Sequence, residues 1–361
     1  MLFRKDAGYH FPACYKTPIE TEALEIGIGG SYCATRIKYA KAASDMIKVK
    51  GGRTSMYEWH EMVQKMVDWL EENITENSSL LKMSEKLGYS PYYCSRQFNQ
   101  LMGMTIRDYV WTRRISRAAL ELRDTDQRIL DIAVKYGFSS QEAFTRAFYK
   151  AFQLTPAAYK KAPRPIPLAI RQEVFSPYHY LIKERDQMDK VHVQPVEIKV
   201  EFIPAHKFIG IWDISATDFI DFWKKGHSCD EICGTLESMS NHALPGQLGQ
   251  MGGWFYQNGQ KGYLYGIPVS LEYDGPIPEQ MECREIPESE YLVFFHPPFD
   301  YLRDNGAVMR AVEEAAWNFD PKKMGYEWDE VVKQDYQRHF PEGYGYAVLR
   351  PVKRSEEHTS E

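Results

Sequence analysis

Two short stretches of this chain carry polar side chains that repeat at helical spacing and can hydrogen bond to nucleic-acid bases. Arginine, glutamine, asparagine, serine and threonine are the residue types that read base edges in the major groove of DNA. The free N–H groups at a helix N-terminus also suit contacts with phosphate. The candidates for DNA contact are Tyr92, Ser95, Arg96 and Asn99 in the first stretch, and Gln141, Glu142, Thr145, Arg146 and Lys150 in the second.

The elements that must position these side chains form two similar segments, at residues 83–98 and 132–148. Each segment contains a short helix, a Gly-aromatic-Ser turn and a second helix with an arginine shortly before a phenylalanine. Gly88 and Gly137 stand where the first helix must end, and glycine tolerates the positive φ of such a position. Each segment is therefore predicted to be a helix–turn–helix unit. The residues that can cap the second helices are Ser90 in the first unit and Ser139 or Ser140 in the second.

The opposite face of each second helix is apolar and is predicted to pack inside a domain. A single polar face of this kind is as compatible with the solvated surface of a helical bundle as with DNA binding. Two copies of the pattern favour DNA binding, and so does the long helix between them, which carries Arg113, Arg114 and Arg117. The inward residues are Cys94, Phe98 and Leu101 in the first unit and Phe144, Ala147, Phe148, Ala151 and Phe152 in the second.

Residues 59–161 resemble the DNA-binding domain of the AraC/XylS family of transcription regulators. The resemblance implies two helix–turn–helix units on one long helix, with recognition helices in successive major-groove segments about 34 Å apart. A single chain then reads an asymmetric site without a dimer, and RNA polymerase is a candidate partner. Three positions depart from the family pattern: Tyr149 replaces lysine, Gln153 replaces glycine and Lys160 replaces arginine. The matching residues are Asp131, Ile132, Ala133, Gly137, Phe138, Ser140, Phe144, Arg146, Phe148, Thr155, Pro156 and Tyr159.

Charge is divided unevenly along the 361 residues. Residues 91–164 carry 13 Lys and Arg against 6 Asp and Glu, a net charge of +7, whereas residues 193–353 carry 14 against 25, a net charge of -11. A basic block beside an acidic one indicates that one part contacts phosphate and the other does not. We therefore expect an all-α DNA-binding domain at residues 56–162, a proline-rich linker at 163–192 and a second domain at 193–353.

The two ends of the chain are assigned to neither domain. Residues 1–55 show no sustained periodicity, whereas Met56 opens an amphipathic helix. We interpret residues 1–55 as a non-native or disordered extension, with a small ordered element as the alternative. Residues 354–361, RSEEHTSE, resemble the translation of a sequencing-adapter oligonucleotide and are interpreted as an artefactual tail.

Residues 193–353 are predicted to form an α+β domain by internal duplication, because the order strand, helix, strands occurs twice. This order resembles the GyrI-like effector-binding domain, which often follows an AraC-type DNA-binding domain. The resemblance implies a groove between the two repeats that binds hydrophobic, often cationic, ligands. The stretches that carry it are IPAHKFIGIW, GGWFYQNGQKGYLYGIPVS, REIPESEYLVFFHPP and YGYAVLRPVK.

This second domain is rich in aromatic residues, which can line a pocket for a small apolar or cationic molecule or simply build the core. Many relatives carry a buried glutamate before the last strand that opposes a cationic ligand, and here the uncharged Gln337 takes that position. Asp335 or Glu282 could supply charge instead, although an unpaired buried carboxylate is costly. We expect a small hydrophobic or aromatic effector. The candidates for binding it are Trp212, Trp254, Tyr256, Tyr265, Phe295, Trp328, Tyr336 and Gln337.

The residue pattern gives little support for chemistry other than binding. It contains no ordered nucleophile–base pair, no clear metal-ligand spacing and no glycine-rich phosphate loop. We therefore predict no catalytic residue, no metal, no cofactor and no enzymatic activity. The group His227, Cys229 and Cys233 lacks a second ligand pair for zinc and fits a helix end better.

Two alternatives remain for the second domain: a GyrI-like hydrolase, or a docking module for a protein partner. The sequence shows no signal peptide and no apolar run approaching about 18 residues. A cytoplasmic bacterial protein without membrane contact is therefore expected.

Overall fold

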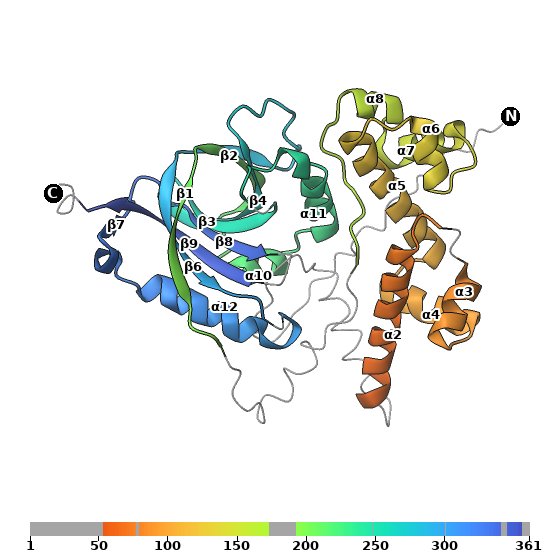
Figure 1. The fold of residues 1–361 in the computed structure, drawn as a ribbon, viewed down its shortest axis with the longest axis horizontal. Coiled ribbons are helices and arrows are strands. Elements are labelled where there is room, and N and C mark those ends of the chain that lie inside the picture. The colour runs from red at the N-terminus through yellow and green to blue at the C-terminus, as the bar shows by residue number, and fades with distance from the viewer. Residues whose placement is uncertain are drawn as a thin grey trace.

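A computed structural model describes residues 53–76, 79–172, 193–247, 249–299, 301–340 and 345–355, which form a helical region and a curled sheet region (Figure 1). The first described helix, α2 (Arg53–Glu72), begins before Met56, so it crosses the predicted domain boundary. Residues 1–52 of the predicted extension and residues 356–361 of the predicted tail lie outside the described residues. Within the described ranges, no helix is long and apolar enough to cross a membrane.

The helical region consists of two packed units that share one long helix, which confirms the all-α prediction. Its elements after α2 are α3 (Leu80–Leu87), α4 (Pro91–Met102), α5 (Ile106–Asp124), α6 (Ile129–Lys135), α7 (Gln141–Phe152) and α8 (Pro156–Lys161). Tyr109, near the start of α5, packs into the core of α2, α3 and α4. Ile115 and Leu122, further along α5, pack into the core of α6, α7 and α8. The two units therefore lie at opposite ends of α5 (Figure 1).

Serine caps begin both second helices of the units, as predicted. Ser90 Oγ accepts a hydrogen bond from the Tyr93 N–H at 3.2 Å, and Ser140 Oγ accepts one from the Ala143 N–H at 3.2 Å. Of the two serines considered in the second unit, Ser140 is the cap. Gln153 ends α7 with a φ of 55°, which is the left-handed conformation that explains why glycine is usual there.

The first part of the predicted linker belongs to the packed structure. Residues 163–172 are extended, and Ile166 and Leu168 are 3% and 2% exposed within the core of the second unit. Residues 173–192, the rest of the predicted linker, lie outside the described residues.

The sheet region contains one antiparallel sheet in the order β1-β6-β9-β8-β3-β4-β2-β5, with β7 paired to β9. Two sets of four strands make up this order, β5-β2-β4-β3 and β1-β6-β9-β8, and strands at the same distance from the two edges correspond to each other. The two sets meet where Gly253 of β3 pairs with Tyr336 of β8. The strands are β1 (Glu197–Ile203), β2 (His206–Asp213), β3 (Met251–Gln257), β4 (Gln260–Ser270), β5 (Glu282–Ile286), β6 (Ser289–His296), β7 (Tyr326–Trp328), β8 (Asp335–Phe340) and β9 (Gly345–Arg354). The predicted duplication and α+β class are therefore confirmed. Strand β9 also includes Arg354, the first residue of the predicted tail.

The two repeats exchange their edge strands. Strand β1 precedes β2 in sequence but pairs with β6, and β5 precedes β6 but pairs with β2. Tyr263 on β4 and Tyr346 on β9 occupy equivalent positions, as do Pro268 and Pro351.

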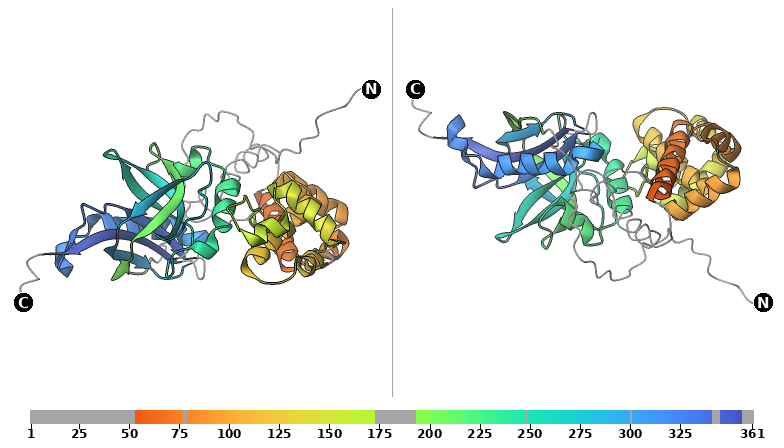
Figure 2. Two further views of the ribbon diagram at one scale, coloured as in Figure 1. Left: turned by 90° about the horizontal axis from the view of Figure 1, so that it is seen from above. Right: turned by 90° about the horizontal axis from the view of Figure 1, so that it is seen from below.

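Helices cover one face of the curled sheet. They are α10 (Phe219–Lys224), α11 (Cys229–Glu237) and α12 (Tyr301–Asn318), with the short turns η2 (Ser240–His242) and η3 (Pro321–Met324). Their apolar residues share a core with Ile209, Tyr263 and Leu292 of the sheet. A second core, which includes Phe208 and Tyr336, lies on the opposite face. Figure 2 shows α11 on the side of the sheet that faces the helical region.

Candidate nucleic-acid interface and effector site

The exposed face of α4 carries all four residues predicted to contact DNA in the first unit. Tyr92 is 76% exposed although it is aromatic, and Ser95, Arg96 and Asn99 are also exposed. The opposite face is closed, because the predicted inward residues are 0–9% exposed in the core of the unit; these are Cys94, Phe98 and Leu101.

Helix α7 presents the corresponding face of the second unit. Gln141, Glu142, Arg146 and Lys150 are exposed, while Thr145 is half-buried and its hydroxyl donates to the Gln141 carbonyl at 2.8 Å. Phe144, Phe148 and Phe152 are 0%, 0% and 8% exposed and fix the helix on its core, and Ala147 and Ala151 pack against that core half-buried. Each unit thus offers a second helix whose outer face is polar and largely exposed, with Lys150 Nζ 5.9 Å from the Trp111 ring centroid.

Three arginines of α5 that were taken to favour DNA binding are bonded within the helical region: Arg113, Arg114 and Arg117. Arg113 Nε donates to Glu71 Oε1 at 2.6 Å, and Arg117 Nη2 donates to Glu71 Oε2 at 2.8 Å. Arg114 Nε donates to the Ile74 carbonyl at 2.7 Å. Burial alone would raise the pKa of Glu71, but the hydrogen bond and charge of Arg113, the hydrogen bond of Tyr109 and the charge of Arg117 lower it. These side chains therefore tie α2 to α5 and fix the geometry between the two units.

The predicted effector residues do not converge on one pocket, because the sheet separates them. Trp254, Tyr265 and Gln337 lie on the face covered by the helices. Trp212, Phe295 and Tyr336 lie on the opposite face. The two remaining candidates are Tyr256, 39% exposed near the end of β3, and Trp328 on β7.

A buried polar network lies where the two repeats meet on the helix-covered face. Tyr263 OH donates to Gln337 Oε1 at 2.5 Å, and Gln337 Nε2 donates to Tyr346 OH at 2.6 Å. Tyr346 OH donates in turn to Glu313 Oε1 of α12 at 2.9 Å. Burial, together with the charge of Asp218, raises the pKa of Glu313, although the bond from Tyr346 opposes this. A carboxyl group perturbed in this way inside an aromatic core is a candidate for ligand binding.

Glu313 and the two tyrosines were not among the predicted site residues. Charge near Gln337 was expected on the strands, from Asp335 or Glu282, whereas the carboxylate comes from Glu313 of α12. Both predicted carboxylates have arginine partners: Arg350 Nε lies 3.4 Å from Asp335 Oδ1, and Arg284 pairs with Glu282. The equivalence of Tyr263 and Tyr346 in the two repeats was the one signal that could have located the network.

Cations of the chain itself cover several of the predicted aromatic residues. The Arg350 guanidinium carbon lies 3.8 Å from the Trp328 ring centroid and 4.8 Å from that of Trp317. Lys261 Nζ lies 5.8 Å from the Trp254 centroid and 5.9 Å from that of Tyr256. These ring faces therefore already make cation–π contacts.

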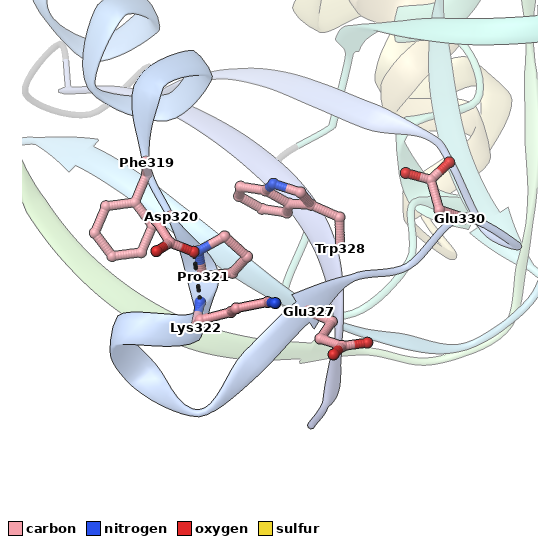
Figure 3. A pocket seen from close by; sticks show the side chains of 7 residues that line it. All are labelled: Phe319, Asp320, Pro321, Lys322, Glu327, Trp328 and Glu330. Atoms are coloured by element: carbon pink, nitrogen blue, oxygen red, sulfur yellow. Dashed lines mark hydrogen bonds between the residues drawn. The ribbon is translucent and has the colours of Figure 1, made fainter. Parts of the chain in front are cut away.

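Trp328 also lines an open pocket of about 550 Å³ (Figure 3). Phe319 and Glu330 line the same pocket. In the part of the chain that the structure describes, no group of three or more His, Cys, Asp or Glu residues could hold a metal ion. His227 instead contacts Asp213, with Nε2 and Oδ2 2.9 Å apart.

Two helix–turn–helix units held at the ends of one helix define a DNA-binding domain of the double helix–turn–helix class. A family model described as a helix-turn-helix domain matches residues 83–162. The chain belongs to the AraC/XylS family of transcription regulators. It is 35% identical over 100 residues to the regulatory protein SoxS of Salmonella typhimurium, a match that covers 28% of this chain and 94% of SoxS.

A second relative is the Right origin-binding protein of Escherichia coli K12, 41% identical over 102 residues. That match covers 28% of this chain and 35% of the relative, so the chain spans about a third of that protein. A solved transcriptional regulator of the AraC type from Chromobacterium violaceum is 28% identical, covering 28% of this chain and 95% of that one with a TM-score of 0.27.

Proposed function

We propose that this chain is a sequence-specific regulator of transcription that reads two successive major-groove segments with α4 and α7. The observation that carries the proposal is that α4 and α7 each present a polar, exposed face and that one helix, α5, packs into the cores of both units. Arg96 and Arg146 are the principal base-reading candidates, because arginine makes bidentate contacts with guanine. Since both units belong to one chain, a monomer suffices for an asymmetric site. RNA polymerase remains a proposed partner.

We further propose that the sheet region senses a small hydrophobic or aromatic molecule. Support comes from the network of Tyr263, Gln337, Tyr346 and Glu313, which places hydrogen-bonding groups inside an aromatic core. A few polar groups within apolar surroundings are the composition typical of small-molecule sites. The relatives reported above bear the names of a regulatory protein and an origin-binding protein, and we propose no catalytic role.

Selection of bound sites from a random duplex library tests the DNA-binding proposal. We expect one asymmetric motif about two helical turns long, with binding that weakens as salt rises. Salt-sensitive binding without an enriched motif would mean that the helical region holds only phosphates, and would contradict sequence-specific recognition.

A further inference from the structure

Helix α11 lies between the core of the sheet region and the DNA-binding domain. Ile232, Cys233 and Leu236 are buried in the core that also contains Tyr263 and Tyr265. The other side of α11 contacts the proline-rich segment, defined here as residues 163–171, which runs beside the helical region (Figure 1). One short helix thus touches both the core that holds the buried tyrosines and the chain that leaves the second helix–turn–helix unit.

The contact between α11 and the proline-rich segment is made by backbone against backbone. A Cβ atom placed on Gly234 would lie 1.9 Å from the Leu168 carbonyl oxygen, so no larger residue fits without separating the two. The Ile166 N–H donates to Ser238 Oγ at 3.0 Å in a buried hydrogen bond. Because no flexible side chain lies between the backbones of Gly234 and Leu168, a small movement of α11 must move the segment or break the contact.

The proline-rich segment is in turn part of the second unit. Ile166 and Leu168 belong to the same core as Phe152 of α7. The Ala169 N–H donates to Ser116 Oγ of α5 at 2.9 Å, and the Arg113 guanidinium donates to the Ala169 carbonyl. A displacement of the segment therefore acts on the core that supports one recognition helix.

Arg123, at the end of α5, joins α5 directly to α11. Its side chain is 4% exposed, and Nη1 donates to the Glu237 carbonyl at 3.1 Å and to the Ser238 carbonyl at 2.7 Å. A cation at the C-terminal end of a helix stabilises the carbonyls that have no partner within the helix. The Arg123 guanidinium also forms an ion pair with Asp124, with Arg123 Nε and Asp124 Oδ1 2.6 Å apart.

We propose that α11, docked on residues 163–171 and held by Arg123, is the element that couples the sheet region to DNA binding by the second helix–turn–helix unit. This proposal rests on the proposed function, because it requires that the chain bind DNA. Arg123 and Gly234 are positioning residues: neither lies on the recognition faces of α4 and α7 or in the buried network around Glu313. Coupling between two sites is reciprocal, so DNA bound at α7 must change the stability of the α11 contact.

The test uses the full chain with the variants Gly234→Ala and Arg123→Lys. Alanine normally stabilises a helix relative to glycine, so a loss of docking in Gly234→Ala reports the collision with Leu168. Matched controls are Glu231→Ala, an exposed position on α11, and Arg128→Lys, an exposed arginine that pairs with Asp131. Circular dichroism confirms folding, and Arg123→Lys keeps the proposal testable if Gly234→Ala fails to fold.

Backbone amide hydrogen exchange is measured over residues 163–171 and 229–240, first without DNA and then with the selected duplex. We expect both docking variants to exchange faster in these two segments, by roughly tenfold, and both controls to match wild type. We also expect the duplex to change exchange in α11 of wild type, and the docking variants to shift duplex affinity by about 5–150-fold.

Equal amide hydrogen exchange in wild type and in both docking variants would overturn the proposed docking of α11 on the proline-rich segment, whether or not a duplex is selected. Duplex binding that leaves α11 exchange and variant affinities unchanged would overturn the coupling while leaving DNA recognition intact. Failure to select any duplex would instead count against the proposed function and, with it, the coupling.

Discussion

Glu71 and Arg113 form a two-point ion pair between α2 and α5, with Nε and Oε1 2.6 Å apart and Nη2 and Oε2 3.0 Å apart. Tyr109 OH donates to the same carboxylate at 2.8 Å, and Arg113 also reaches the Ala169 carbonyl. One buried carboxylate therefore joins the first unit, the long helix and the proline-rich segment.

Replacement of Glu71 by alanine should lower the free energy of unfolding of the helical region by about 3–5 kcal/mol, because it leaves Arg113 buried without its partner. The pKa of Glu71 is lowered in the folded state, so its stabilisation is present at neutral pH. It should be lost as the pH falls below the ordinary range of glutamate toward the folded value. Urea unfolding from pH 7 to pH 3 measures both effects; equal stability of wild type and variant at neutral pH would refute them.

Arg96→Ala and Arg146→Ala should each weaken binding to the selected duplex by about 1–3 kcal/mol and relax specificity in separate halves of the site. The control Arg128→Ala removes an exposed arginine from the same domain, outside both recognition faces. Titration against duplexes mutated in one half at a time locates each contact. Wild-type affinity in both variants would show that the recognition residues lie elsewhere.

Gly88→Ala and Gly137→Ala form a matched pair, because both glycines have positive φ, 76° and 79°. A Cβ on Gly88 meets nothing within 4 Å, whereas one on Gly137 would lie 2.7 Å from Arg114 Nη1. We expect a loss of about 1 kcal/mol for Gly88→Ala from backbone strain and a larger loss for Gly137→Ala. Thermal unfolding measures the difference, and equal losses would mean that Arg114 moves aside freely.

Asp335 should make stability decrease as the pH rises between about 4 and 6. Burial raises its pKa to about 6, against the opposing charges of Arg350 and Lys261. The folded state therefore binds the proton more tightly than the unfolded state, and that advantage disappears as the folded group ionises. Asp335→Asn should flatten the pH profile in this window; an unchanged slope would assign it to another group.

Glu313→Gln should separate a charge requirement from simple apolar binding in the sheet region. Glutamine keeps an oxygen to accept from Tyr346 but removes the negative charge. Thermal shift with matched cationic and neutral aromatic compounds is the measurement. If Glu313 serves the effector, cations should lose their stabilising shift in the variant while neutral compounds keep theirs; identical shifts in both proteins would exclude that role.

The helical region could be predicted well from the sequence, because the residues that define its helices lie close together in the chain. Caps, glycine turns and the apolar face of α7 lie within a few residues of each other, so their pattern can be read directly. The duplicated sheet was also recognisable from its element order. The network around Gln337 could not be predicted from the sequence, because it joins β4, β8, β9 and α12. No local spacing of residues shows which face of a strand meets a helix. The contacts of the α5 arginines could not be predicted for a related reason, since charge alone does not reveal that Arg113 and Arg117 bond to Glu71 of α2.

The exchanged edge strands also have a consequence for biosynthesis. Because β1 pairs with β6 and β5 pairs with β2, neither repeat can complete its own sheet. The helical region, built on contacts closer in sequence, can form as soon as it leaves the ribosome. Strands β2, β3 and β4 can then pair with one another, whereas β1 must wait for β6. During that interval β1 presents an unpaired edge with Val200 and Phe202 exposed even in the finished fold. A nascent chain halted before β6 should therefore be prone to aggregation.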